Sequence, residues 1–254
     1  MGFDIPWSTR KAVVAFSGGL DSTVLLTAMT DRLGPSNVLA VSFNYGQRHI
    51  RELAAAKGVC SRLNVRHIIV DLPSLAPLWQ DLGSTSSLVD PGTDVPDGHY
   101  AQDNMRSTIV PNRNMILIAI STSMAVAWGA QVVAVAVHGG DHFIYPDCRF
   151  DFIQSMARSV VLGTRHEDDS STDPGATVLL APFIEMTKAE IVRLGYDTEA
   201  PMELSWSCYK GGSNHCGKCG TCVERIEAFR LAGVDDPTLY DDIDFADVAL
   251  SRGG

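Results

Sequence analysis

The chain has 254 residues, of which 45% are hydrophobic, so it is long and apolar enough for one large α/β domain with a buried core. Its 30 Asp and Glu against 20 Lys and Arg give a formal net charge of -10, which argues against a broad basic face for tRNA or DNA and favours a small-molecule substrate. No apolar run of about 18 residues and no secretory signal is readable, so we expect a cytoplasmic protein without a membrane span.

Apolar, β-branched runs alternate with helical patterns along the chain. The runs lie at 12–16, 38–43, 67–70 and 132–137, and the helical patterns lie at 21–33, 50–63 and 113–128. This alternation predicts an α/β fold with a doubly wound, mostly parallel sheet, for which we expect five strands. Ligands bind beyond the carboxyl ends of parallel strands, so the unusual segments at 44–49, 73–112 and 138–149 are expected to surround one site. The segment at 73–112 is long enough to be a lid, a substrate loop or an interface arm.

The sequence SGGLDS at 17–22 stands where the first strand turns into the first helix. Gly18 and Gly19 let backbone N–H groups approach an anion closely, and the helix N-terminus directs its positive dipole end to the same point. Ser17 and Ser22 add hydroxyl donors. No lysine follows the second glycine, so the loop lacks the lysine that binds a γ-phosphate in a Walker A loop. It suits pyrophosphate better. The alternative is a Gly-Gly turn with an ordinary helix cap.

Cationic and hydrogen-bonding side chains follow at later strand ends. After the second strand, Arg48 is able to neutralise phosphate or carboxylate charge, and Gln47 and Tyr45 offer directional hydrogen bonds; a polar turn is the alternative. Arg113 opens a helix from which it could reach an anionic ligand; an ordinary helix start is the alternative, since Asn and Pro are common there. Lys188 opens another helix, where it could stabilise leaving phosphate charge or simply be an exposed lysine.

The loop at 138–149 carries polar residues of a second kind. The loop contains Asp141, Tyr145, Asp147 and Arg149. The carboxylates of Asp141 and Asp147 could bind a purine-like amidine edge or a magnesium ion. We expect these side chains to be on the substrate side of the site.

Four cysteines lie close together near the C-terminal end, at Cys208, Cys216, Cys219 and Cys222. Four thiolates suit tetrahedral zinc and leave no open coordination position, so a structural Zn²⁺ is predicted. An iron–sulfur cluster and reduced, unliganded thiols are the alternatives. His215 is interpreted as a neighbour and not a fifth ligand, and Cys60 and Cys148 are interpreted as packed residues.

Three regions are predicted: an ATP-binding α/β domain at 1–199, a four-cysteine zinc-binding segment with a closing helix at 200–233, and an acidic tail at 234–254. We expect the tail to be a solvated end. The polar stretch at 167–176 is expected to be a surface insertion, and no function is assigned to it.

Five motifs together resemble the 7-cyano-7-deazaguanine synthase family, a branch of the PP-loop ATP pyrophosphatases. The motifs are FSGG with DST at 16–23, YGQRH at 45–49, PNRN at 111–114, YPDCR at 145–149 and the four-cysteine end. The match covers most of the chain. The first motif alone would indicate only ATP cleavage to AMP and pyrophosphate, as in GMP synthetases, argininosuccinate synthases and tRNA thiolases. The other motifs are more specific.

The resemblance implies an ATP-dependent C–N ligase that converts 7-carboxy-7-deazaguanine and ammonia to 7-cyano-7-deazaguanine (preQ0), with AMP and pyrophosphate released twice, in queuosine or related biosynthesis. It also implies Mg²⁺, one structural Zn²⁺ and a homodimer, and no nucleic-acid partner. By the resemblance, nucleotide binding falls to Phe16, Ser17, Gly18, Gly19, Leu20, Asp21, Ser22, Thr23, Val24, Leu25, Leu26, Tyr45, Gln47, Arg48 and Arg113. The resemblance also implies catalytic roles for Ser17, Asp21, Ser22, Arg48 and Lys188. It implies substrate contacts by Asp141, Tyr145, Asp147 and Arg149.

The chain departs from many family members at Leu20, where Gln is common, and at Asn112, where Gly is common. A variant that stops at 7-amido-7-deazaguanine, or one that serves DNA modification, would keep every motif. A tRNA-modifying PP-loop enzyme and a nucleotide-binding sensor without turnover are more distant alternatives.

Overall fold

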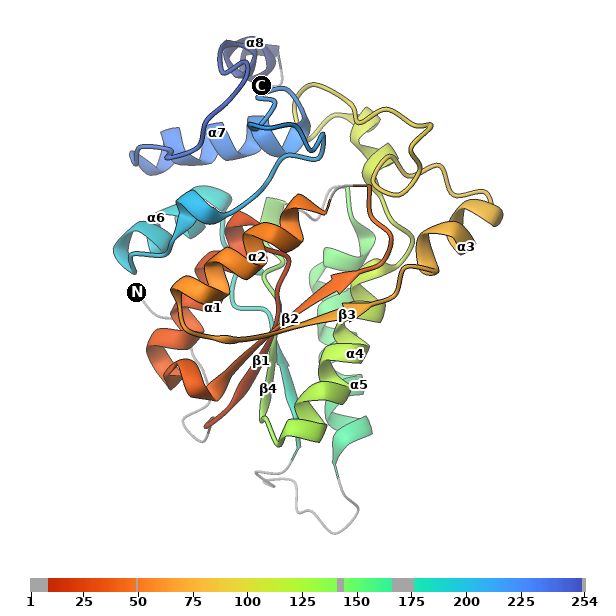
Figure 1. The fold of residues 1–254 in the computed structure, drawn as a ribbon, viewed down its shortest axis with the longest axis vertical. Helices are drawn as coiled ribbons and strands as arrows, with labels where there is room; N and C mark the ends of the chain where they lie inside the picture. Colours follow the sequence, from red (N-terminus) through yellow and green to blue (C-terminus); the bar gives the residue numbers. More distant parts are fainter. Residues whose placement is uncertain (1–8, 49, 141–143, 166–175, 253–254) are drawn as a thin grey trace.

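The computed structural model describes residues 9–48, 50–140, 144–165 and 176–252. Five parallel strands form one sheet in the order β3-β2-β1-β4-β5 (Figure 1). The strands are β1 (Ala12–Ala15), β2 (Val38–Asn44), β3 (Arg66–Asp71), β4 (Val132–Ala134) and β5 (Val178–Leu180). The chain winds outward from β1 in one direction and then in the other, so the switch point lies between β1 and β4. The predicted doubly wound sheet is confirmed.

Eight α-helices lie among the described residues. They are α1 (Leu20–Leu33), α2 (Arg51–Arg62), α3 (Leu75–Asp81), α4 (Arg113–Trp128), α5 (Phe150–Thr164), α6 (Lys188–Asp197), α7 (Gly220–Ala232) and α8 (Asp244–Arg252). The predicted helices at 21–33, 50–63 and 113–128 match α1, α2 and α4 to within one residue at each end. None of the helices in this described part is long and apolar enough to cross a membrane.

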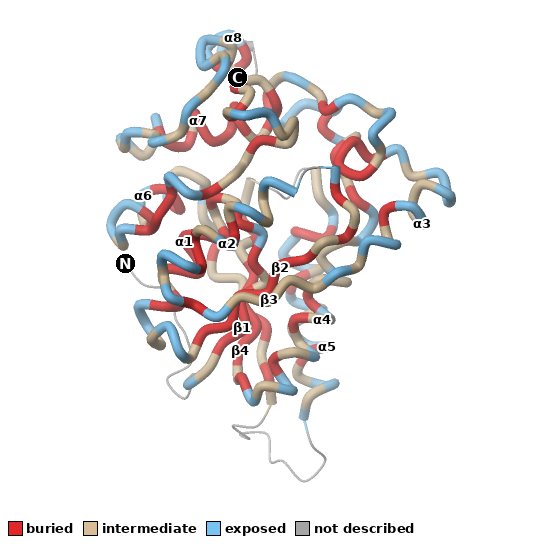
Figure 2. Tube along the Cα trace, viewed as in Figure 1, coloured by how far each residue is buried: buried red, intermediate tan, exposed pale blue. Residues whose placement is uncertain are grey.

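Alternate residues of the strands supply two cores, one on each face of the sheet. Val14 and Val38 pack with α1, α2, α6 and α7, whereas Val13 and Val133 pack with α4 and α5. The two sets of helices lie on opposite sides of the sheet in Figure 1, and Figure 2 shows the strands buried between them. Burial on both faces explains why the strands read as continuous apolar runs and not as alternating ones.

The acidic tail packs against the body of the protein, so the expectation of a solvated end was wrong for Asp236, whereas Asp235, Asp241, Asp244 and Asp247 are exposed. Asp236 accepts a 3.3 Å contact from Arg225 of α7, a residue that is 0% exposed, and Tyr240 donates to Asp236 at 2.6 Å. A Cβ built on Gly217 would lie 1.9 Å from the Asp242 carbonyl oxygen, so the tail closely covers the cysteine-bearing loop.

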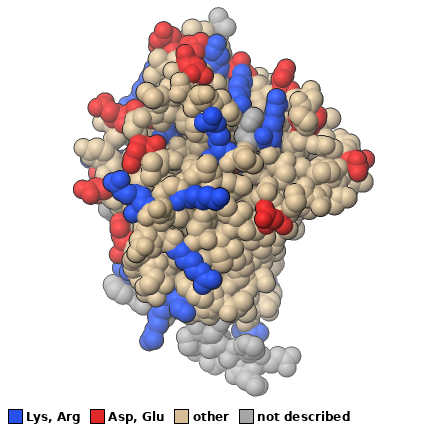
Figure 3. Space-filling view, in the orientation of Figure 1, with Lys and Arg blue, Asp and Glu red and all other residues tan. Residues whose placement is uncertain are grey.

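Charges on the face drawn in Figure 3 are mixed. Lys and Arg side chains lie mainly over its central part with uncharged surface between them, and Asp and Glu side chains lie mainly towards its upper, left and right margins.

Candidate active site

The SGGLDS sequence at 17–22, called here the phosphate cradle, forms the turn from β1 into α1. Gly18 has a φ of +83°, and a Cβ there would lie 2.4 Å from the Glu52 carbonyl oxygen, so both the backbone conformation and the close approach of α2 require glycine. The Gly19 N–H donates to Ser17 Oγ (3.1 Å), and the Ser17 and Ser22 hydroxyls are 3.1 Å apart. The two hydroxyls and the N-terminus of α1 therefore meet at one point.

The phosphate cradle opens on a cavity of about 260 Å³ at the carboxyl ends of β1, β2 and β4. The long segment at 73–112 contributes Tyr100, Met105 and Thr108 to its wall, and the loop after β4 contributes Tyr145 and Cys148. The strand ends and both loops thus surround one site, as the sequence predicts for segments 73–112 and 138–149.

Lys188 joins two carboxylates at the edge of the phosphate cradle. A capping box between Thr187 and Glu190 begins α6, so that Lys188 is the first helical residue. Its Nζ lies 3.2 Å from Asp21 Oδ2 and 2.7 Å from Glu224 Oε2. Burial would raise the pKa of Asp21, but the charge of Lys188, helped by His138, lowers that pKa below its usual value. The cluster therefore holds an ionised carboxylate beside a cation.

His138 completes this cluster from the loop that follows β4. Its Nδ1 accepts from the Gly140 N–H at 3.1 Å, while its Nε2 faces Asp21 Oδ2 and Glu224 Oε1, each at 3.9 Å. Asp21 Oδ1 is buried and accepts no hydrogen bond from the described residues. That oxygen is consequently left for a partner that the described residues do not supply.

A second charged group lies on the other side of the cavity. Arg113, the first residue of α4, donates from Nη1 to the Tyr45 hydroxyl at 3.1 Å. Glu52, in the first turn of α2, lines the same cavity. Burial raises the pKa of Glu52 to about 7, although the charge of Arg113 lowers it.

Several predicted site residues have structural contacts. Gln47 is buried, accepts from the Tyr45 N–H and donates to the Phe43 carbonyl, so it closes the turn after β2 while lining the cavity. Arg48 is exposed, donates to the Thr93 carbonyl at 3.0 Å and does not line the cavity.

In the loop after β4, too, some predicted site residues line the cavity and others do not. Asp147 Oδ2 accepts from the Asn114 N–H at 2.9 Å and so caps α4, outside the cavity wall. Arg149 is exposed, whereas Tyr145 lines the cavity and its hydroxyl lies 2.7 Å from Thr108 Oγ1. Asp141 lies outside the described residues.

Within the predicted nucleotide-binding stretch, only the first part faces the cavity. Its lining members are Phe16, Ser17, Gly19, Leu20, Asp21 and Ser22. Val24, Leu25 and Leu26 are 0% exposed in the core, and Thr23 Oγ1 donates to the Gly19 carbonyl at 2.8 Å. These four residues hold α1 in place beneath the phosphate cradle.

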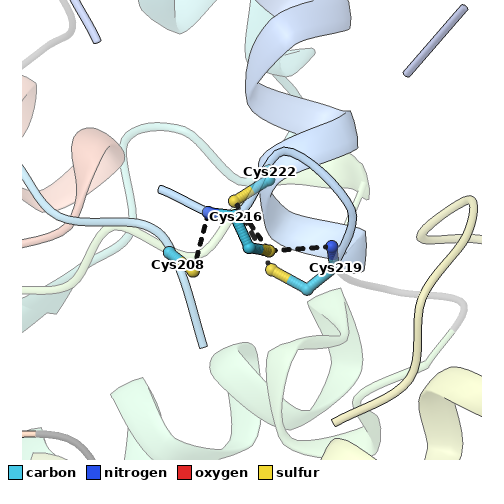
Figure 4. Close-up of side chains that lie close together, drawn as sticks. All are labelled: Cys208, Cys216, Cys219 and Cys222. Carbon is cyan, nitrogen blue, oxygen red and sulfur yellow. Dashed lines mark hydrogen bonds between the residues drawn. The ribbon is translucent and has the colours of Figure 1, made fainter. Parts of the chain in front are cut away.

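The four cysteines converge, as Figure 4 shows, with their sulfur atoms all within 4.8 Å of one another. Backbone N–H groups of Lys218 and Cys219 donate to Cys216 Sγ at 3.3 Å, which favours a thiolate there. His215 Nε2 accepts instead from the Ser207 N–H at 3.0 Å, consistent with its interpretation as a neighbour. This donor set fits one tetrahedral metal ion, and Cys60 and Cys148 lie buried outside it.

Sequence reasoning missed two carboxylates of the cavity wall, Glu52 and Glu224, and the nearby His138, whose Nε2 faces Asp21 and Glu224. Glu52 stands in the helical turn that follows the loop at 44–49, and Glu224 lies two residues after Cys222. Their positions after recognised motifs were the only available signal, because a single Glu or His in a helix or at a strand end has no pattern of its own.

Comparison with known proteins decides the family. A model described as queuosine biosynthesis protein QueC matches residues 11–233 of the chain. The chain belongs to the QueC family. It is similar to 7-cyano-7-deazaguanine synthases from Brucella anthropi (47% identity, 95% of this chain and 98% of that one), Rhizobium johnstonii (48%, 95% and 97%) and Brucella ovis (48%, 92% and 95%).

The span that matches the QueC model includes the phosphate cradle, the segments at 45–49, 111–114 and 145–149, and all four cysteines. The family resemblance expected from the sequence is therefore confirmed over the regions that build the cavity and the cysteine cluster.

Proposed function

We propose that this QueC-family chain converts 7-carboxy-7-deazaguanine and ammonia to 7-cyano-7-deazaguanine at the expense of ATP. The observation that carries the proposal is the position of Lys188, 3.2 Å from Asp21 in a phosphate cradle that opens on a cavity. This arrangement suits pyrophosphate departure, and the relatives named 7-cyano-7-deazaguanine synthase supply the substrate class.

In the first half of the reaction, a substrate carboxylate oxygen attacks the α-phosphorus of ATP and the bond to the β-phosphate oxygen breaks. The Gly19 region, Ser17 and Ser22 offer donors to the departing pyrophosphate, and Lys188 balances its charge. Ammonia then attacks the acyl carbon, AMP leaves and one proton is lost, which gives the amide. The role of the protein is to position these groups and to neutralise charge.

In the second half, the amide oxygen attacks the α-phosphorus of another ATP and pyrophosphate leaves again. Loss of the remaining amide protons and departure of AMP then form the nitrile. The same phosphate cradle serves both steps, because in each an oxygen attacks the α-phosphorus of a bound ATP and pyrophosphate leaves.

Two metal ions belong to the proposal. The Asp21 Oδ1 atom, buried and without a hydrogen-bond partner in the described chain, fits a ligand for Mg²⁺, which would neutralise phosphate charge when bound with ATP. The four cysteine sulfurs fit a structural Zn²⁺, which would hold the loop at 208–222. The proposal also includes a phosphate contact by the exposed Arg48. It includes assembly of the protein as a homodimer.

The test is pyrophosphate release and product mass with ATP, ammonia and 7-carboxy-7-deazaguanine. We expect pyrophosphate release that depends on the deazaguanine and a product of nitrile mass. Accumulation of the amide would identify the truncated reaction, and no dependence on the deazaguanine or on ammonia would reject the proposal. Release stimulated by tRNA instead would identify an RNA-modifying enzyme.

A further inference from the structure

Three carboxylates of the described chain line the cavity, and only two of them are paired. Asp21 and Glu224 lie within 3.2 Å and 2.7 Å of Lys188 Nζ. The Glu52 carboxylate makes no hydrogen bond or ion pair within the described residues, although burial is strong enough to raise its pKa to about 7. A desolvated carboxylate beside an open cavity is costly unless a ligand supplies donors.

The nearest opposite charge to Glu52 belongs to Arg113. Its guanidinium acts on Glu52 electrostatically, but the two side chains form no ion pair within 4.0 Å. The Tyr45 hydroxyl accepts one N–H of Arg113 at 3.1 Å and so fixes the guanidinium on its own side. The acceptor oxygens of Glu52 and the donor N–H groups of Arg113 thus line the same cavity without forming an ion pair with each other.

This arrangement complements one particular ligand edge. A 2-amino-4-oxopyrimidine ring presents an oxo acceptor, a ring N–H donor and an exocyclic amine donor in a row. A carboxylate has two oxygens for the two donors, and a guanidinium donates to the oxo group. Leu53, Leu117 and Val137 line the same cavity and offer apolar contacts to a flat ring.

We infer that Glu52 and Arg113 recognise the 2-amino-4-oxopyrimidine edge of the deazaguanine substrate, with Glu52 taking the two N–H donors and Arg113 the oxo group. The inference rests on the proposed function and names the residues that select its substrate. It replaces the sequence-based expectation for Asp147, whose carboxylate caps α4.

Two other ligands could engage Glu52. Ammonium would be repelled by the guanidinium of Arg113, which makes this pair a poor cation site. The adenine of ATP presents only one exocyclic amine to a carboxylate, so it leaves one carboxylate oxygen unused. If Glu52 binds ammonium or adenine instead, Glu52→Gln should change the Michaelis constant for ammonia or for ATP and not the affinity for the deazaguanine.

The experiment compares two ligands on three proteins: the wild type, Glu52→Gln and the exposed control Glu203→Gln. Calorimetry gives the affinities for 7-carboxy-7-deazaguanine and for its analogue without the 2-amino group. We expect the wild type and Glu203→Gln to prefer the parent by about 10-fold or more, because the analogue leaves a buried acceptor unpaired. Glu52→Gln should weaken parent binding about 10-fold and analogue binding less than about 3-fold, with the Michaelis constant for ATP unchanged.

Equal affinity of the wild type for parent and analogue would overturn the inference, even if the substituted proteins failed to fold. A Glu52→Gln effect on ATP or on ammonia alone, or equal losses for both deazaguanines, would also overturn it. In each of these results wild-type nitrile formation would leave the proposed function standing. If the wild type neither binds nor converts 7-carboxy-7-deazaguanine, the proposed function fails, and the inference fails with it.

Discussion

Lys188 forms ion pairs with carboxylates from the N-terminal and the C-terminal parts of the chain. Its ammonium lies between Asp21 of the phosphate cradle and Glu224 of α7, which are separated by about 200 positions in the sequence. A lysine so placed is held in one position by two carboxylates, and only 14% of its side chain is exposed. We propose that this charge, held where little water reaches it, stabilises developing phosphate charge more strongly than an exposed lysine would.

Lys188→Met is expected to lower kcat for pyrophosphate release by about 100-fold or more, since it removes the cation but keeps most of the side-chain volume. Lys57→Met, on the exposed surface of α2, is the matched control and should leave kcat unchanged. Steady-state kinetics on both variants makes the comparison. If Lys188→Met retained kcat within about 3-fold of wild type, the lysine would have a structural role only.

Glu52 gives a prediction about stability and pH. Burial raises its pKa from 4.5 to about 7, with Arg113 as the nearby charge that opposes the rise and Tyr45 packed beside it. Between these two values the folded protein holds a proton that the unfolded chain has lost, so the free energy of unfolding falls as the pH rises. Above about pH 7 the loss is complete, and it amounts to roughly 3 kcal/mol.

Glu52→Gln removes this titration. The variant should match the wild type near pH 4.5 and become progressively more stable than it up to about pH 7, with a constant difference above that pH. Urea unfolding at a series of pH values measures the difference. Parallel curves for the two proteins would show that the carboxylate is not desolvated in the folded state.

Local geometry was predictable where the residues of a group are neighbours in sequence. The turn at 17–22 and the convergence of the four cysteines are local, and spacing alone predicted both. Asp147 shows where this fails: a carboxylate at a loop end suits ligand binding and helix capping equally, and only the fold shows its contact with the Asn114 N–H. Glu224 was missed because its partner, Lys188, is remote in sequence.

At the scale of elements, the turn from β1 into α1 depends on the close approach of α2. The phosphate cradle is held from behind as well, since the Trp206 N–H donates to the Gly18 carbonyl at 2.9 Å. Most strand and helix positions followed from periodicity, but the approach of α2 to Gly18 did not, because hydrophobic patterns show which face is buried and not what lies against it.

Gly18→Ala is expected to destabilise the protein by about 2 kcal/mol or more and to weaken ATP binding, because the new Cβ combines a left-handed backbone with a 2.4 Å approach to backbone oxygen. Gly58→Ala is the matched control. A Cβ at Gly58, inside α2, meets nothing within 4 Å, so this change should stabilise by about 0.5 kcal/mol. Thermal unfolding measures both, and equal effects would contradict the close approach.

The cysteine cluster connects elements of the whole molecule. Lys210 pairs with Asp97 of the long segment at 73–112, and the Gly98 N–H donates to the Lys218 carbonyl at 3.0 Å. The Tyr100 hydroxyl donates to Glu227 of α7 at 3.0 Å. The segment at 73–112 thus reaches the cavity from an anchorage on the cysteine-bearing loop, which sequence periodicity could not show because these contacts are non-local.

Removal of the metal should therefore affect the whole protein. If the four cysteines hold zinc as proposed, Cys219→Ser is expected to lose it and to lower Tm by roughly 10 °C or more, because metal affinity is part of the folding free energy. Cys60→Ala, a buried cysteine outside the cluster, should keep its zinc. Elemental analysis and calorimetric melting measure the two properties. A Cys219→Ser protein that is metal-free but melts like the wild type would refute a structural role.

The acidic tail supplies a counter-charge to a fully buried cation. Arg225 is 0% exposed, and its remaining N–H groups donate to Ser205 Oγ (2.8 Å) and to the Met202 carbonyl (3.1 Å). Those partners belong to the segment that leads to Trp206, whose N–H donates to Gly18, so we expect Asp236 to stabilise the site through Arg225. Composition could not reveal this, because a run of acidic residues reads as a solvated end unless its buried partner is known.

Asp236→Asn should consequently lower the free energy of unfolding by about 3 kcal/mol, since it leaves the Arg225 charge without a carboxylate. Asp247→Asn is the matched control. Asp247 also pairs with an arginine of α7, Arg230, but both side chains are about half exposed, so its loss should cost less than about 1 kcal/mol. Urea unfolding separates the two cases. Similar small losses would mean that Ser205 and the Met202 carbonyl satisfy Arg225 unaided, and that the tail covers the protein without stabilising the site.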